Sequence, residues 1–361
     1  MSVRELFAPR PAPPSRLGFY RKFSTHAGVH LSPIALGGLN IGDKWHEYGL
    51  GSMTKESSFE LLNSYFDLGG NFIDTANAYQ DGRSEEFIGE WAEGREIRDQ
   101  LFIATKYTNN AHHHNAKFAQ QIFFAGNSAK SMHLSIESSL KRLRTTYIDL
   151  LYVHWWDYTT SIKEVMHALH ALVLARKVLY LGISDAPAWV VAKANEYARC
   201  NALTPFCVYQ GRWSILDRSF ERDIIPMARD EGIALAPWSD WLRTPQEKAV
   251  CDALEEVAGE VGAKHINAVA IAYVMQKTQF VFPIIGGRKV EQLVTNLEAL
   301  EIALSNEQIA YLDAASPIDL GFPHSVIVWD GSTNGLLNSS TGHVEFWPRA
   351  QPIKPTRKVE V

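Results

Sequence analysis

Three predicted strands of this chain each end in a titratable side chain. Asp74 follows an apolar pair at 72–73, Tyr79 lies five residues further on, and Lys106 and His154 each close a later apolar run. In a parallel barrel the carboxyl ends of the strands open on one face, where active sites are built. A phenol beside an ammonium that is paired with a carboxylate is a proton donor with a lowered pKa. The pattern therefore predicts an acid–base site made of these four side chains.

The elements that would carry these side chains alternate between strands and helices. Eight apolar runs separated by helical stretches favour an α/β fold with a parallel sheet closed on itself, in a single domain. A doubly wound open sheet is the rival topology, and it is disfavoured because no strand ends in a G-x-G-x-x-G turn that opens a helix. The predicted strands are 34–37, 71–74, 101–105, 148–153, 179–183, 206–209, 232–236 and 281–285, and the predicted helices include 55–68, 84–93, 130–143, 162–175, 188–199, 218–230 and 246–259.

Composition and charge narrow the class of protein. The 361 residues are 46% hydrophobic and 11% aromatic, which is enough for a substantial core. The net charge is −5 with scattered Lys and Arg, so no nucleic-acid partner is expected, and no apolar run is long enough to cross a bilayer. The start of the chain has no signal-peptide pattern, and three cysteines cannot all pair, which suits a reducing compartment. A cytoplasmic enzyme is predicted.

The segments FIDTANAY (72–79), TKY (105–107) and YVH (152–154) resemble the aldo-keto reductases, a family of (β/α)8 TIM barrels that reduce carbonyls with NADPH. The resemblance implies that Tyr79 is the general acid, Lys106 lowers its pKa, Asp74 holds Lys106, and His154 orients the carbonyl. Within the family the chain is most similar to fungal aryl-alcohol dehydrogenases and norsolorinic acid reductase-like enzymes. That closer likeness is carried by GNFIDTANAYQD, AKSM, KVLYLGISDAPAWVV and VFPIIGGRKVEQL.

The same resemblance places nicotinamide-binding residues at three further strand ends. It implies that Ser184, Asp185 and Gln210 hold the carboxamide of the nicotinamide and that Trp238 stacks on the ring, although Trp238 could instead be a core indole. Many family members have Asn where Asp185 stands. An ionised carboxylate accepts a hydrogen bond from the amide but donates none.

The eighth strand leads into a segment suited to an anion. Backbone N–H groups at a helix N-terminus, with two cations beside them, would suit the 2′-phosphate of NADP(H). By resemblance Gly286 belongs to this turn, while Arg288, Gln292 and Asn296 share one helical face and grip the phosphate and adenine. The alternative is a Gly-Gly turn with a solvated Arg-Lys pair.

The chain departs from this family after Trp238. Relatives continue into a long loop over the cofactor pyrophosphate, whereas residues 239–245 here run almost straight into a helix, as if a few tens of residues were absent. A skipped exon, a degraded relative, or a short loop in which Arg243 suffices would each explain this.

The remaining expectations concern the chain ends and lesser motifs. One barrel domain is expected over 1–361, with a flexible start at 1–16, a hairpin from 17–23 and 29–31 under the barrel floor, and a C-terminal loop at 321–361. Trp155 could offer an indole face to an aryl substrate or simply pack. The aromatics Trp329, Phe346 and Trp347 could shape the pocket or anchor the tail. The His112–His114 run is expected to be a solvated loop, and no metal site is predicted.

The sequence thus predicts an NADP-dependent oxidoreductase that interconverts aromatic aldehydes or ketones and their alcohols, in aryl-alcohol or secondary-metabolite metabolism. Its partners would be NADP(H) and a small aromatic carbonyl or alcohol, with no nucleic acid and no membrane; the oligomeric state stays open. The alternative is a catalytically impaired or regulatory protein on the same barrel, which lacks the pyrophosphate loop.

Overall fold

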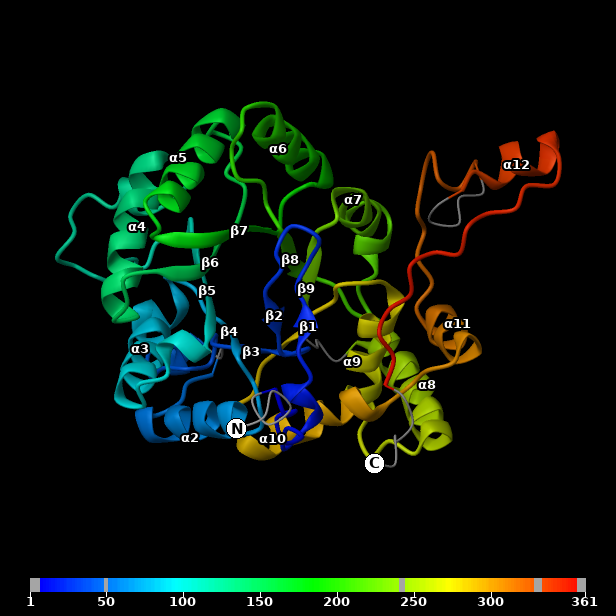
Figure 1. Cartoon of the computed structure of the whole chain (residues 1–361), viewed down its shortest axis with the longest axis horizontal. Coiled ribbons are helices and arrows are strands. Elements are labelled where there is room, and N and C mark those ends of the chain that lie inside the picture. Colours follow the sequence, from blue (N-terminus) through cyan, green and yellow to red (C-terminus); the bar gives the residue numbers. More distant parts are fainter. Residues whose placement is uncertain (1–6, 49–50, 240–243, 328–332, 356–361) are drawn as a thin grey trace.

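The computed structural model describes residues 7–48, 51–239, 244–327 and 333–355, and a closed barrel dominates them (Figure 1). Its eight parallel strands follow one another in chain order around the sheet. The last strand returns to the first, and hydrogen bonds from Leu235 N to Phe280 O (2.9 Å) and from Phe282 N to Leu235 O (2.8 Å) bring the two ends together. This confirms the predicted (β/α)8 TIM barrel. The strands are β3 (Ala35–Gly37), β4 (Phe72–Asp74), β5 (Phe102–Tyr107), β6 (Ile148–Val153), β7 (Val178–Ser184), β8 (Val208–Arg212), β9 (Ala234–Trp238) and β10 (Ile284–Ile285).

Helices surround the sheet and pack on its outer face. Several of them begin at a Ser or Thr whose side chain accepts a hydrogen bond from a first-turn N–H, as at Thr54, Ser128 and Ser161. The helices are α2 (Lys55–Asp67), α3 (Arg83–Gly94), α4 (Ala129–Arg142), α5 (Ile162–Leu174), α6 (Ala188–Cys200), α7 (Ile224–Glu231), α8 (Pro245–Val261), α9 (Ile266–Lys277), α10 (Val290–Leu297), α11 (Asn306–Ala315) and α12 (Gly335–Thr341).

One predicted helix is shorter than expected. The stretch 218–230 begins as a separate 3-10 turn at Ser219–Glu221, and α7 starts only at Ile224. Pro226 explains this, because proline has no N–H and is tolerated in the first turn of a helix but not in its interior.

A small hairpin closes one end of the barrel. Strands β1 (Arg21–Lys22) and β2 (His30–Leu31) pair antiparallel, as predicted, and cross the near end of the barrel in Figure 1. Phe23, just after β1, packs edge-to-face on Phe72, Phe102 and Phe282 with ring centroids 5.1–5.8 Å apart. Phe72 and Phe102 are the first residues of β4 and β5. The amino ends of the strands are therefore sealed by apolar side chains, and the carboxyl ends are left for polar ones.

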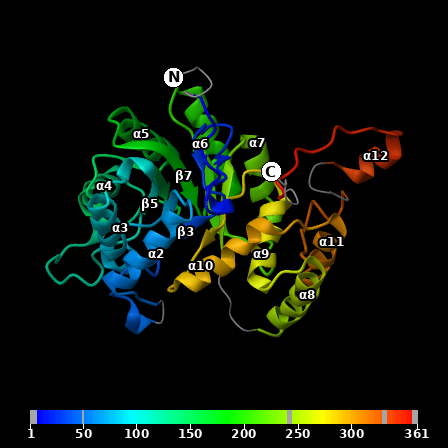
Figure 2. The same cartoon turned by 60° about the horizontal axis from the view of Figure 1, so that its bottom comes forward.

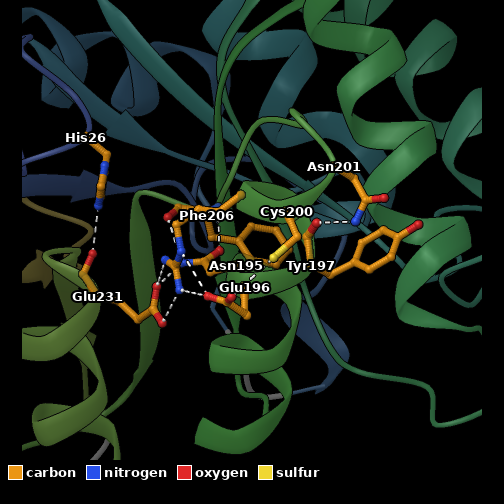
Figure 3. A network of polar contacts seen from close by, with 9 residues as sticks. His26, Asn195, Glu196, Tyr197, Cys200, Asn201, Phe206 and Glu231 are labelled. Carbon is orange, nitrogen blue, oxygen red and sulfur yellow. Dashed lines mark hydrogen bonds and ion pairs between the residues drawn. The ribbon is translucent and has the colours of Figure 1, made fainter.

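A polar network outside the barrel holds α6 against α7 (Figure 3). The buried Glu231 accepts hydrogen bonds from Arg199 Nη1 (2.5 Å) and Asn195 Nδ2 (3.1 Å), and Asn195 Oδ1 accepts from Phe206 N (2.8 Å). His26, from the hairpin, contacts the Glu231 carbonyl at 2.8 Å. The network fixes the approach to β8, which carries one of the predicted site residues.

The part of the C-terminal segment around α12 lies apart from the barrel, whereas Gln351 O accepts from Gln279 Nε2 (3.3 Å) and Lys354 Nζ donates to Leu304 O (2.6 Å). Helix α12 and the described chain that follows it directly stand away from the other helices in both views (Figures 1 and 2). Phe346 and Trp347 are 57% and 94% exposed. Both expectations for these two rings, shaping the pocket and anchoring the tail on the barrel, are therefore wrong. Trp329 lies outside the described residues.

Two kinds of feature are absent from the described residues. No helix there combines the length and the apolar character needed to span a membrane. No group of three or more His, Cys, Asp or Glu side chains there is arranged to hold a metal ion.

Candidate active site

The centre of the site is a buried ion pair between neighbouring strands. Asp74 ends β4, and Lys106 lies on β5; their exposed fractions are 2% and 0%. The Lys106 ammonium contacts the Asp74 carboxylate and donates to Thr75 O at 2.8 Å. Burial lowers the pKa of Lys106, but the charges of Asp74 and then Tyr79 outweigh it, so the net pKa is raised. Lys106 is therefore a fixed cation in a dry environment.

Tyr79 lies against this cation, in a 3-10 turn at Tyr79–Gly82. Lys106 Nζ is 5.0 Å from the centre of the Tyr79 ring. Burial raises the pKa of Tyr79, and the opposing charge of Lys106 only partly offsets it, while Asp74 raises it further. The expectation of a lowered pKa is thus wrong, because desolvation of the phenolate exceeds the attraction of one already paired ammonium. Tyr79 keeps its proton at neutral pH.

His154 follows β6 and completes the group. Its ring is edge-to-face with Tyr79, with centroids 5.9 Å apart, and only 8% of the residue is exposed. Burial, and then the charge of Lys106, lower the pKa of His154 well below its ordinary value. His154 is therefore neutral at physiological pH. The structure thus brings all four residues of the predicted acid–base site together at the carboxyl ends of β4, β5 and β6.

Gln80, which the sequence reasoning missed, holds a loop over this group. Its buried amide donates to Leu39 O and Gly51 O, both at 3.0 Å, and accepts from Lys44 N (2.9 Å) and Trp45 N (2.8 Å). The loop carries Trp45, whose ring lies edge-to-face with Tyr79 at 6.3 Å. An indole therefore lies beside the Tyr79 ring. The only signal in the sequence is the polar residue directly after Tyr79.

Predicted nicotinamide residues line the next strand ends. Ser184 ends β7, and its buried Oγ makes no hydrogen bond to any described residue. Gln210 lies on β8 opposite Ser184, and its Nε2 donates to Asp74 Oδ2 at 2.8 Å. Gln210 Oε1 can accept a hydrogen bond from a carboxamide NH₂. Ser184 and Gln210 together offer a hydroxyl and an acceptor oxygen, which fits a carboxamide.

Asp185 and Trp238 flank this pair. Asp185 has a left-handed backbone (φ 44°), and desolvation by the surrounding groups raises its pKa to about 6. Trp238 is the last residue of β9 and is half-buried. Both side chains line a cleft of about 950 Å³, which also includes Trp155, Trp189 and Phe220. Trp238 therefore faces a cleft, and Trp155 is 52% exposed beside His154.

The predicted phosphate residues lie around the start of α10. Gly286 follows β10, and Arg288 and Gln292 are exposed, with Arg288 N donating to Gln292 Oε1 at 2.8 Å. Lys289, at the N-cap, makes no side-chain capping bond, and Gln292 N donates to Lys289 O at 3.2 Å, which leaves the N–H groups of Val290 and Glu291 for a ligand. Asn296 lies one turn beyond Gln292 on the same helix and is half-buried. Open N–H groups and an exposed guanidinium at one helix end fit an anionic phosphate.

The shortened connection after the seventh barrel strand is visible in the element bounds. Strand β9 ends at Trp238 and α8 begins at Pro245, with the cap Thr244 accepting from Glu247 N. Arg243, which could substitute for the pyrophosphate loop, lies outside the described residues.

Comparisons with known proteins identify the family. The model of the aldo/keto reductase family matches residues 33–317. An aryl-alcohol dehydrogenase [NADP(+)] of Phanerodontia chrysosporium is 50% identical, covering 98% of this chain and 100% of the relative. A putative aryl-alcohol dehydrogenase of Saccharomyces cerevisiae is 47% identical over 94% of this chain and 97% of its own. Norsolorinic acid reductase B of Dothistroma septosporum is 46% identical over 93% of this chain and 94% of its own length.

The match to the Phanerodontia protein extends over 385 residues, more than the 361 of this chain, so that relative has residues with no counterpart here. The family match nevertheless spans the barrel from before β3 to beyond α11. On the strength of this match and of these relatives, the chain belongs to the aldo/keto reductase family of oxidoreductases.

Proposed function

We propose that this protein is an NADP-dependent reductase that interconverts aromatic aldehydes or ketones and their alcohols. The observation that carries the proposal is the buried Asp74–Lys106 pair beneath a protonated Tyr79, with a neutral His154 across the ring. The names of the relatives point in the same direction, since they include an NADP(+)-dependent aryl-alcohol dehydrogenase and a norsolorinic acid reductase.

The residues of the chain have distinct roles in this reaction. Bound NADPH supplies a hydride to the carbonyl carbon, so negative charge develops on the carbonyl oxygen. Tyr79 donates its proton to that oxygen, and His154 orients it by a hydrogen bond. Lys106, fixed by Asp74, stabilises the phenolate that remains. In alcohol oxidation Tyr79 acts as the base.

Cofactor binding is assigned to the strand ends beyond His154 and to α10. Ser184, Asp185 and Gln210 hold the carboxamide, and Trp238 stacks on the ring. Gly286, Arg288, Gln292 and Asn296 receive the 2′-phosphate and adenine. Charge-assisted contacts at the helix N-terminus favour NADP(H) over NAD(H), which lacks that phosphate.

Aromatic side chains around the reacting group favour an aryl substrate. Trp45 and Trp155 approach Tyr79 and His154 from two sides. Flat rings prefer edge-to-face or offset contacts with other rings, and each such pair contributes about 0.5–1.5 kcal/mol beyond area burial. The proposed setting is cytoplasmic aryl-alcohol or secondary-metabolite metabolism.

The proposed functional unit is a single barrel domain; parts of both predicted terminal segments, 1–6, 328–332 and 356–361, lie outside the described residues. The alternative of a catalytically silent regulatory barrel is not supported by the relatives, which are named for dehydrogenase and reductase activities.

Titration of the purified protein with NADPH and with NADH, followed by tryptophan quenching, tests the cofactor assignment. Tighter binding of NADPH is expected, and turnover of a benzaldehyde by the NADPH complex is then measured. A folded protein that binds neither nucleotide would overturn the proposal and point to the shortened connection after β9.

A further inference from the structure

Asn109, in the loop after β5, contacts His154. The hydrogen-bonding role of a neutral histidine depends on which ring nitrogen carries the proton. Asn109 Nδ2 lies 3.1 Å from His154 Nδ1. Neither the composition of the chain nor the spacing of its residues indicates a functional role for Asn109. It lies three residues after Lys106, beyond the end of the strand.

The loop around Asn109 is held in one conformation. The preceding residue, Thr108, has a left-handed backbone with φ 104°, which is uncommon for a β-branched residue. Two contacts maintain it: Gly126 N donates to Thr108 O and Asn127 Nδ2 donates to Thr108 Oγ1, both at 2.9 Å. Asn109 O in turn accepts a hydrogen bond from Asn77 Nδ2 at 2.9 Å. The side chain of Asn109 therefore meets His154 from a backbone fixed on both sides.

The chemistry of a neutral imidazole makes this contact consequential. Such a ring carries one N–H, and the hydrogen bond at one nitrogen sets which nitrogen is protonated. An amide N–H that donates to Nδ1 needs a lone pair there, so the proton resides on Nε2. With Nδ1 engaged by Asn109, Nε2 is the nitrogen left to meet a carbonyl oxygen, and it can donate only if it carries the proton. With the proton on Nδ1, Nε2 would present a lone pair to that oxygen.

We propose that Asn109 is a positioning residue that holds His154 in the Nε2–H tautomer, so that His154 donates a hydrogen bond to the substrate carbonyl. This inference rests on the proposed carbonyl reduction. Its direct test does not, because the tautomer is observable without turnover.

The first test is the ¹⁵N NMR spectrum of histidine-labelled protein without ligand. The His154 signals are identified by their loss in His154→Gln, since the chain has 13 histidines. A protonated Nε2 and an unprotonated Nδ1 are expected. A proton on Nδ1 of the wild-type ring would overturn the inference, whatever the activity of the enzyme.

The second test is Asn109→Asp, which keeps the shape but replaces the donor by an acceptor. The carboxylate accepts from Nδ1–H, so the neutral ring loses its Nε2–H. We expect kcat/KM for a benzaldehyde to fall about tenfold, the worth of one ordinary hydrogen bond. The groups that already face His154 are Tyr79, Lys106 and, through Trp155, Asp185. An added carboxylate favours the imidazolium, which again has an Nε2–H, so activity of the variant should recover as the pH is lowered.

Asn110→Asp is the matched control. Asn110 is the next residue, but its amide is engaged by Gln121 Oε1 and His112 N, both at 2.8 Å. The Asn110→Asp variant should retain the wild-type kcat/KM and pH profile. An Asn109→Asp enzyme with a wild-type rate and pH profile would refute the positioning role. A wild-type protein with the expected tautomer but no carbonyl reductase activity would instead refute the proposed function.

Discussion

Replacement of Gln80 by glycine separates the contribution of its left-handed backbone from that of its side-chain hydrogen bonds. Gln80 has a left-handed backbone (φ 55°), and its side chain makes four hydrogen bonds to the loop that carries Trp45. A left-handed L-residue costs about 1–2 kcal/mol, which glycine avoids. The variant Gln80→Gly therefore relieves backbone strain while it releases the loop.

The expected loss of stability follows from these contacts. Four hydrogen bonds at about 0.5–1.5 kcal/mol each contribute roughly 2–6 kcal/mol. The lower half of that range applies, because Leu39 and Lys44 are exposed and water can replace the amide there. The relief of strain is largely cancelled by the greater entropy of glycine in the unfolded chain. A decrease of about 2 kcal/mol in the free energy of unfolding is expected.

The assays are urea unfolding and substrate comparison. Trp45 loses the hydrogen bond from its backbone N–H to Gln80 and keeps that from its indole N–H to Asp81 Oδ1 (3.1 Å). KM should therefore rise several-fold for a benzaldehyde and stay nearly constant for a small aliphatic aldehyde, which does not need the indole. Glu96→Gly is the matched control: Glu96 is exposed and its φ of 56° is close to that of Gln80, so its replacement should change stability by less than about 1 kcal/mol. A Gln80→Gly enzyme with wild-type stability and an unchanged ratio of the two KM values would refute the reasoning.

Three further predictions concern pH and cofactor. The rate of aryl-aldehyde reduction should be independent of pH between 6.5 and 10, the ordinary pKa values of His and Tyr, because the pKa of His154 is lowered and that of Tyr79 is raised. The rate of alcohol oxidation, which needs the Tyr79 phenolate, should rise with pH over that interval. Initial rates in both directions check this. The Asp185→Asn variant should bind NADPH more tightly than the wild type. The ratio of wild-type to variant Kd should increase as the pH rises through about 6, because the Asp185 carboxyl then ionises beside an anionic cofactor. Equal Kd values at pH 5 and pH 8 in both proteins would contradict the placement of Asp185 beside the cofactor. Arg288→Ala should weaken NADPH binding by about 1.5–3 kcal/mol, roughly tenfold to a hundredfold, and leave the Kd of NADH almost unchanged, as measured by tryptophan quenching; equal losses for the two nucleotides would exclude a 2′-phosphate contact.

The strand ends could be predicted from the sequence because each depends only on a local apolar run. Asp74, Lys106 and His154 lie where their runs end, and the parallel topology then brings them to one face of the barrel. The same logic places Ser184, Gln210 and Trp238 at the ends of the following strands.

What the sequence did not predict depends on contacts distant along the chain. Gln80 gains its importance from a loop some forty residues earlier, and Asn109 from the left-handed backbone at Thr108. The direction of the Tyr79 pKa shift is a balance of burial against two opposite charges, which residue types alone cannot decide. The exposure of Trp347 depends on a tail that leaves the barrel.

The most direct test of the central claim is Tyr79→Phe, which removes the proton donor and keeps the ring that contacts Lys106 and His154. The variant and the wild type are compared in a single-turnover reduction of a benzaldehyde by bound NADPH. The account predicts an NADPH Kd within about twofold of the wild type and a reduction rate lower by about 10²–10⁴, the usual contribution of a general acid. A variant that binds NADPH and reduces the aldehyde at the wild-type rate would show that Tyr79 is not the proton donor.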